Sequence, residues 1–222
     1  QVDGGQIYLQ KLDENGEKPW GDEEKIVGRL QSRVSAPLSM ITDSDGGVII
    51  VWEEIRENFV HIYAQKFNSN GDPLWDVGGL LVSLNNAQNA IQPRAVTDNE
   101  GGVVISWAYH SGSGTTQVRA QRVSKDGLLT WGTDGIIVAG FAFRDSITKI
   151  ASDQRGGAYI LYRGDNTQTL LVQNINSQGA LLWGPGGKVV SNTTTSHISQ
   201  YEFITDNLGG LYIKWSTIVN GV

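Results

Sequence analysis

The chain contains no cysteine and a single methionine among its 222 residues. Without cysteine, structural disulfides, thiolate metal sites and cysteine nucleophiles are excluded. Long apolar runs are also missing, since no stretch approaches the roughly 18–20 residues that a membrane-spanning helix needs. We therefore expect no insertion into a membrane.

Positive charge is scarce: 17 Lys and Arg stand against 23 Asp and Glu, for a net charge of −6. Without a basic patch to neutralise phosphates, we expect no nucleic-acid partner. The chain begins at Gln1 and contains no signal peptide, which we interpret as a processed mature protein or an excised piece of a longer one. We expect an extracellular or cell-surface location in a bacterium, with the periplasm as the alternative.

Helical periodicity is missing as well, whereas glycine and tryptophan are frequent, with 28 and seven residues. Glycine-rich turns between β-branched and aromatic runs are typical of all-β proteins. One spacing occurs four times: a Gln, a Gly six residues later, a Trp four residues after the Gly and a Val seven residues after the Trp. The copies span residues 10–27, 65–82, 121–138 and 173–190, so the period is 52 to 56 residues.

A second motif alternates with the first: Asp-x-x-Gly-Gly, four mostly apolar residues and an aromatic. Its copies read "DSDGGVIIVW", "DNEGGVVISW", "DQRGGAYILY" and "DNLGGLYIKW". The run after Gly-Gly is apolar at consecutive positions, which predicts a strand buried on both faces. The turns "ENG", "SNG", "KDG" and "SQG" predict hairpins, because Asn and Gly tolerate positive φ.

Four short strands in each period predict an all-β fold, a β-propeller of four four-stranded blades. We expect a single domain over residues 1–222, with repeats at approximately 1–35 plus 198–222, 36–90, 91–145 and 146–197. The chain opens on strands three and four of a repeat and closes on strands one and two. We therefore expect a blade shared between the N-terminal and C-terminal strands. The alternatives are a dimer that completes an eight-bladed ring and a slice of a longer propeller.

The repeated residues have structural interpretations. We expect the Trp and Tyr positions to fill the core between blades, because each buries roughly 200 Å². The Asp before Gly-Gly can accept backbone N–H bonds and hold a turn. A repeated calcium site is the alternative, but only "DSDGG" offers a second nearby carboxylate. We expect no metal site.

The stretch "GGVIIVWEE…HIYAQKFNSNGDPLW" resembles the blade of quinoprotein-type (PQQ-like) propellers. That family's docking motif reads Ala-x-Asp-x-x-Thr-Gly-x-x-x-Trp. Gly71 and Trp75 match it, while Gln65, Phe67 and Asn70 replace the other positions. The resemblance implies a propeller of the kind found in secreted or surface bacterial proteins. Quinone dehydrogenases of this type use eight-bladed rings with an acidic calcium site, which the sequence lacks, so no quinone site and no cofactor are expected.

Candidate site residues are few. Tyr109 and His110 form an aromatic pair in a polar segment between strands, and Arg163 and Asp165 belong to an "RGD" tripeptide. We expect these four in loops, where blades differ and function concentrates. The glutamates in "EEIREN" are interpreted as a solvated loop, and the three histidines as surface or loop residues without a catalytic arrangement.

With fold-serving repeats and no recognisable catalytic set, we predict a scaffold that is not an enzyme and that presents its loops to a protein partner. A carbohydrate-binding, lectin-like propeller is the alternative, because amides and hydroxyls beside an aromatic ring suit sugars. The third interpretation is a glycoside hydrolase-like propeller, which requires carboxylates converging at one mouth of the central channel.

Overall fold

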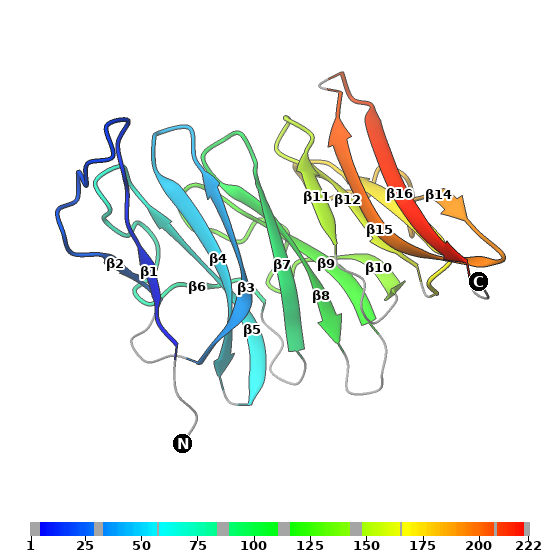
Figure 1. Cartoon of the computed structure of the whole chain (residues 1–222), viewed down its shortest axis with the longest axis horizontal. Coiled ribbons are helices and arrows are strands. Elements are labelled where there is room, and N and C mark those ends of the chain that lie inside the picture. Colours follow the sequence, from blue (N-terminus) through cyan, green and yellow to red (C-terminus); the bar gives the residue numbers. More distant parts are fainter. Residues whose placement is uncertain are drawn as a thin grey trace.

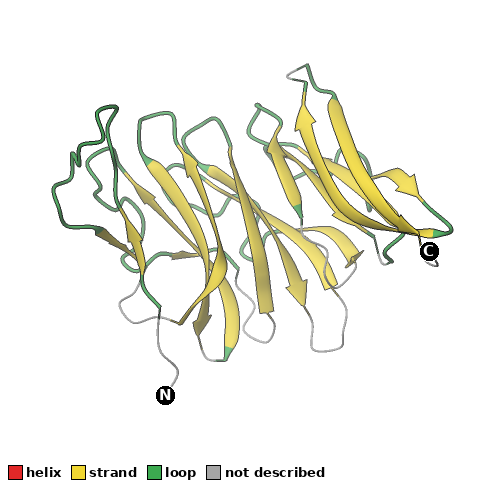
Figure 2. Ribbon diagram, viewed as in Figure 1, coloured by secondary structure: helices red, strands yellow, loops and turns green. Residues whose placement is uncertain are grey.

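The structure is a computed structural model that describes residues 5–28, 33–56, 58–83, 89–110, 116–142, 148–164, 166–206 and 208–219. In this part of the chain there are sixteen β-strands and no helix, so no helix crosses a membrane (Figure 2). The strands are β1 (Ile7–Leu9), β2 (Lys25–Val27), β3 (Arg33–Thr42), β4 (Val48–Arg56), β5 (Phe59–Phe67), β6 (Leu80–Leu81), β7 (Asn89–Thr97), β8 (Val103–His110), β9 (Thr116–Val123), β10 (Ile136–Ala142), β11 (Lys149–Ser152), β12 (Ala158–Arg163), β13 (Thr169–Ile175), β14 (Lys188–Asn192), β15 (Ser196–Thr205) and β16 (Leu211–Val219).

The strands form three complete antiparallel sheets of four strands each. We name them blade I (β3–β6), blade II (β7–β10) and blade III (β11–β14). Two further sheets contain two strands each: the N-terminal pair (β1, β2) and the C-terminal pair (β15, β16). The prediction of an all-β chain with four-stranded, propeller-like repeats is confirmed, including the strand order within each repeat.

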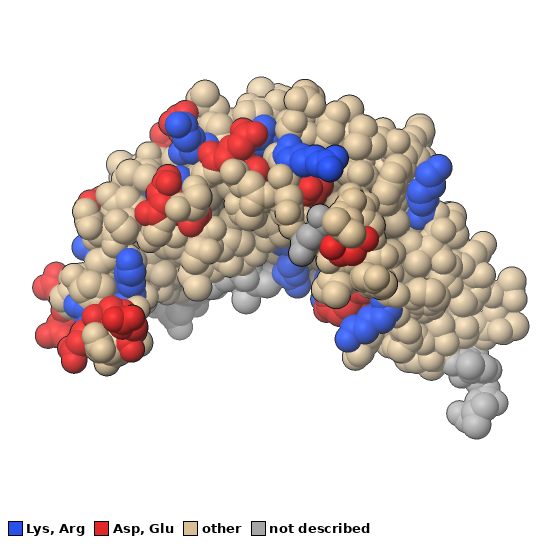
Figure 3. All heavy atoms as spheres, turned by 90° about the horizontal axis from the view of Figure 1, so that it is seen from above, with Lys and Arg blue, Asp and Glu red and all other residues tan. Residues whose placement is uncertain are grey.

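The blades stand side by side along a curve, and the two chain ends lie at opposite ends of it (Figure 1). Seen from above, the molecule is a crescent (Figure 3). Within the described residues, β1 pairs only with β2, and β15 only with β16. The predicted blade shared between the two termini is therefore wrong for this structure. The reason is that the sheets follow an open curve, which keeps the two terminal pairs apart (Figure 1).

The apolar core lies between consecutive sheets. The middle strands β4, β8 and β12 are buried on both faces, as their apolar runs predict. Trp52, Trp107 and Tyr162 are among the largest fully buried side chains, which confirms the core role predicted for them. Trp215 of the C-terminal pair takes the same position but is 42% exposed.

The Trp before the fourth strand docks onto the next sheet in the N-terminal pair and in blades I and II. The indole N–H of Trp75 in blade I donates to the carbonyl oxygen of Lys125 in blade II at 3.0 Å. A Cβ atom at Gly127 would lie 2.9 Å from Cδ1 of Trp75, at a φ of +81°. Glycine is thus needed in the turn both for its conformation and for the close approach of the ring. Trp20 and Trp131 dock in the same way, onto the carbonyl oxygens of Ser69 and Ser177.

The Asp before Gly-Gly closes the turn into each second strand, as predicted. In blade I, Oδ1 of Asp43 accepts the N–H groups of Asp45 and Gly47 at 2.9 and 2.6 Å. Its other oxygen lies 3.0 Å from Nζ of Lys66, a buried ion pair. The same two backbone bonds recur at Asp98, Asp153 and Asp206.

Candidate functional site

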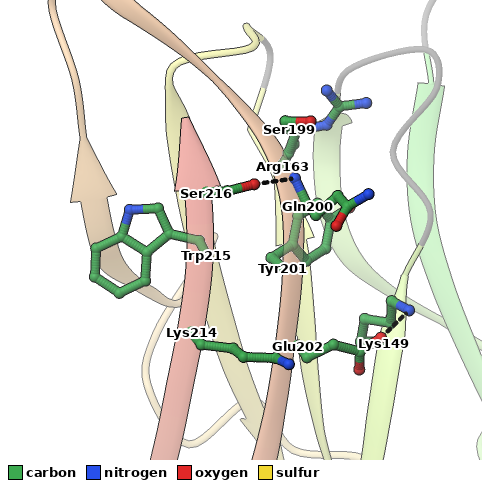
Figure 4. A pocket seen from close by; sticks show the side chains of 9 residues that line it. All are labelled: Lys149, Arg163, Ser199, Gln200, Tyr201, Glu202, Lys214, Trp215 and Ser216. Atoms are coloured by element: carbon green, nitrogen blue, oxygen red, sulfur yellow. Dashed lines mark hydrogen bonds and ion pairs between the residues drawn. The ribbon is translucent and has the colours of Figure 1, made fainter. Parts of the chain in front are cut away.

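A cleft of about 510 Å³ opens between blade III and the C-terminal pair. The first strand of each sheet contacts the first strand of the next sheet, so these strands lie on the inner side of the curve; they are β3, β7, β11 and β15. The cleft lies on this inner side. β11 and β15 supply more than half of the cleft's residues. The lining consists of Lys149, Arg163, Ser199, Gln200, Tyr201, Glu202, Lys214, Trp215 and Ser216 (Figure 4).

A β-bulge in β15 shapes the cleft. The register of β15 against β16 shifts between Ile198 and Tyr201. The backbone N–H of Gln200 donates to Oγ of Ser216 at 3.3 Å, and Arg163 of blade III donates from Nη1 to the carbonyl oxygen of Ile198 at 3.2 Å. Bulges re-aim side chains locally. Here the bulge is held from its own sheet and from the neighbouring blade.

An ion pair joins the two sides of the cleft. Nζ of Lys149 in β11 lies 2.6 Å from Oε1 of Glu202 in β15. Both residues stand four positions before the Asp of their own repeat, where blades I and II carry Ser39 and Arg94. This position of the first strand is therefore polar in blades I to III and in the C-terminal pair, and its residues in the last two sheets meet across the cleft.

The cleft is locally positive although the whole chain is acidic. Three of its residues are cationic, namely Lys149, Arg163 and Lys214, and one, Glu202, is anionic. Figure 4 shows the amine of Lys214 directed toward Glu202, while the ring of Trp215 lies on the opposite side of β16 from the other side chains. The polar groups can therefore act together on one ligand, and the indole serves a different surface.

The structure separates the four predicted site residues. Arg163 lines the cleft. Tyr109 lies in β8 rather than in a loop and is buried, with the guanidinium carbon of Arg119 4.6 Å from its ring centroid. His110 ends the same strand, and its Nδ1 lies 2.9 Å from Oγ1 of Thr116. Asp165 lies outside the described residues. The loop placement of Tyr109 and His110 is wrong because β8 continues three residues past Trp107, where the repeat predicts its end, and Arg163 is the last residue of β12.

Two glutamates predicted in a solvated loop are buried in β4 instead. Glu54 accepts hydrogen bonds from the indole N–H of Trp52 and from Arg56. Glu53 accepts the backbone N–H of Gln92 in blade II, so its carboxylate serves blade packing. Among the described residues, no group of three or more His, Asp or Glu is placed to hold a metal.

The sequence-based analysis missed Lys149, Gln200, Glu202 and Lys214. One signal was available: aligning the repeats by the Asp of each motif places Ser39, Arg94, Lys149 and Glu202 in one column of polar residues. The contribution of Gln200 and Lys214 depends on the bulge and on the neighbouring blade, which the repeat spacing does not contain.

No protein-family model matches the chain, and no curated protein matches it. Solved structures do resemble it. A levansucrase variant from B. megaterium has a TM-score of 0.48 and 12% identity, over 92% of this chain and 67% of its own. An exo-β-1,3-galactanase from Clostridium thermocellum has a TM-score of 0.46 and 13% identity, over 99% of this chain and 46% of its own. The exo-β-1,3-galactanase from Phanerochaete chrysosporium, solved with β-1,3-galactotriose, has a TM-score of 0.49 and 14% identity, over 97% of this chain and 48% of its own.

These comparisons correct the functional prediction. The similar structures are enzymes, so a scaffold that is not an enzyme is not the interpretation that they favour. The chain spans about half to two thirds of their length. At these identities the likeness concerns the fold, and no activity passes from them to this chain. The resemblance to quinoprotein-type blades likewise stays at the level of blade architecture.

Proposed function

We propose that the cleft between blade III and the C-terminal pair binds an acidic carbohydrate. The observation that carries this proposal is the grouping of three cations with an amide and hydroxyls in one cleft of about 510 Å³. Clefts of roughly 300–1,000 Å³ are the size that encloses small ligands. The side chains of Gln200, Ser199 and Ser216 can donate to and accept from sugar hydroxyls.

The charge of the cleft selects the kind of sugar. Lys149 is paired with Glu202, and because Lys214 and Arg163 also line the cleft, three cations stand against one acid. Ammonium and guanidinium groups bind carboxylate or sulfate through charge-assisted hydrogen bonds, which are stronger than those between neutral groups. A uronic acid or a sulfated sugar supplies such an anion together with hydroxyls.

The proposal concerns binding. Glycoside hydrolysis commonly uses two carboxylates that flank the scissile bond. Of the described residues that line the cleft, Glu202 is the only acid. Neutral and acidic polysaccharides should therefore be assayed for released reducing ends alongside binding. A signal that Glu202→Gln abolishes would assign a catalytic role to this carboxylate.

The test is titration calorimetry with polygalacturonate, chondroitin sulfate and neutral dextran. Binding of an acidic polymer that weakens with added salt is expected, with no binding of dextran. Lys214→Gln should weaken it by roughly tenfold, the worth of one charged hydrogen bond. Lys18→Gln removes the same charge from the distant N-terminal pair and should have no effect. An equal loss of affinity in both variants, or no binding of either acidic polymer, would refute the proposal.

A further inference from the structure

Trp215 of β16 and Tyr8 of β1 are exposed aromatics that stand at opposite ends of the chain, 42% and 61% exposed. In blade I the same two positions of the repeat hold Trp52 and Tyr63, which face each other across β4 and β5 and stack with ring centroids 6.0 Å apart. Trp52 and Tyr63 are buried. The two terminal pairs therefore each carry one half of an aromatic pair that a complete blade buries.

A second half-pair is electrostatic. In blade I, Asp43 binds its turn through Oδ1 and meets Lys66 of the third strand through Oδ2 at 3.0 Å. Asp206 of the C-terminal pair binds its own turn in the same way, through the N–H groups of Leu208 and Gly210. The residue equivalent to Lys66 is Lys11, which follows β1. The C-terminal pair thus presents the acid and the N-terminal pair the matching base.

A third half-pair is the tryptophan-docking contact. Trp20, Trp75 and Trp131 each rest on a turn glycine of the next sheet. The fourth such residue, Trp183 of blade III, is not met by any turn glycine among the described residues. The first turn glycine, Gly16, has the same φ of +81°, and no described atom lies within 4 Å of the position of its Cβ. One Trp without a glycine and one glycine without a Trp remain.

We propose that a second copy of the chain docks on the C-terminal pair, so that β1 and β2 of that copy become its third and fourth strands. The register follows the complete blades, which pair Trp52 with Tyr63, Trp107 with Arg119 and Tyr162 with Leu171. β16 then lies antiparallel to β1 of the second copy, with Trp215 opposite Tyr8.

The reciprocal contact closes the assembly. Two copies contribute six complete blades and two composite blades, which makes a ring of eight, a common propeller size. Tyr212 and Ile204, exposed on the outer face of the C-terminal pair, are then covered by blade I of the second copy, as large exposed apolar patches on soluble proteins usually are. A second copy, and not the same chain, fills the place because the two terminal pairs lie at opposite ends of the crescent (Figures 1 and 3). Glu202 and Lys214 share this surface with Tyr212 and Ile204, so the second copy borders the cleft, although the inference does not depend on the ligand.

Engineered disulfides test the register, since the chain has no cysteine of its own. Thr217 and Gln6 occupy the repeat positions of Glu54 and His61, which pair directly in blade I. The proposed register therefore places Thr217 opposite Gln6 of the second copy. The double variant Thr217→Cys, Gln6→Cys should form a covalent dimer under mild oxidation. Thr217→Cys with Leu12→Cys lies six residues out of register on the same face and should not. A cross-linked monomer would show a self-closed ring and overturn the proposal, as would the absence of any cross-link.

The native assembly is tested by sedimentation of the chain without cysteines. Wild type is expected near twice 24.1 kDa. Lys11→Glu places two acids together and should weaken the dimer by roughly tenfold or more. Lys125→Glu makes the same charge change at an exposed turn of blade II, away from both terminal pairs, and should leave the dimer unchanged. A wild-type chain that stays monomeric at micromolar concentration, or equal effects of both variants, would overturn the proposal.

Discussion

Gln65 and Trp75 lie ten residues apart and are joined by a hydrogen bond: the backbone N–H of Trp75 donates to Oε1 of Gln65 at 2.9 Å. The side-chain amide of Gln65 also donates to the carbonyl oxygen of Asp76 at 2.9 Å. Blades II and III repeat the bond to the Trp at 2.9 and 3.1 Å. The Gln therefore ties the third strand to the segment that carries the Trp, which explains why the two residues keep a constant spacing.

Removing this link should destabilise the fold. Gln65→Ala leaves the N–H of Trp75 and the carbonyl of Asp76 without their partner near the core, and we expect a loss of about 2–3 kcal/mol in the free energy of unfolding. Urea denaturation monitored by tryptophan fluorescence measures it. Gln178→Ala, at an exposed turn, should change the free energy by less than about 0.5 kcal/mol. Comparable losses in the two variants would disprove the role given to Gln65.

The docking of Trp75 can be isolated with two glycines of like conformation. Gly127 and Gly132 have φ values of +81° and +84°, but only at Gly127 does an added Cβ meet the ring of Trp75, at 2.9 Å. Gly132→Ala should lose about 1–2 kcal/mol through its backbone alone. Gly127→Ala should lose more and should shift the emission of Trp75. If the two substitutions cost the same, the contact with the ring contributes nothing to stability.

The buried pair of Asp43 and Lys66 makes stability depend on pH. Burial by itself raises the pKa of Asp43, but hydrogen bonds from Lys66, Gly47 and Asp45 outweigh it and hold the pKa below its ordinary value of 3.8. A carboxyl whose pKa is lower in the folded state stabilises that state above pH 3.8, and this contribution disappears as the pH falls through the lowered pKa. Urea unfolding between pH 2 and 7 should show the loss.

The control for this prediction is Lys66→Met, which removes the main cause of the lowered pKa. The variant should be less stable at neutral pH and should lose less stability than wild type on acidification, because its Asp43 titrates closer to 3.8. An unchanged acid dependence would mean that other carboxylates govern it.

The repeat could be recognised in the sequence because each blade is stabilised by contacts between residues close in the chain. The Asp that binds its own turn and the glycine at positive φ act within five residues and recur with every period. Such contacts leave fixed spacings in a sequence, and from them strand order, turn positions and the buried aromatic strands could be predicted.

The cleft, by contrast, corresponds to almost no fixed residue spacing in the sequence. Lys149, Glu202 and Arg163 come from three strands of two sheets, and their meeting depends on how closely β15 approaches blade III and on the bulge after Ile198. The burial of Glu53 and Tyr109 escaped prediction for a related reason: in each case the length of the strand, set by what the neighbouring blade covers, differed from the length suggested by the local pattern.

The sequence by itself determined the blade: four strands, their order, the turns and the positions of the docking tryptophans, all of which follow from local backbone chemistry and an alternation of apolar runs. Only the tertiary structure decided how far each blade rotates against the next. That rotation arises from side-chain packing across the sheet interfaces, which no residue spacing encodes. It separates the two terminal strand pairs, leaves Trp215 and Tyr8 exposed and opens the cleft beside Arg163.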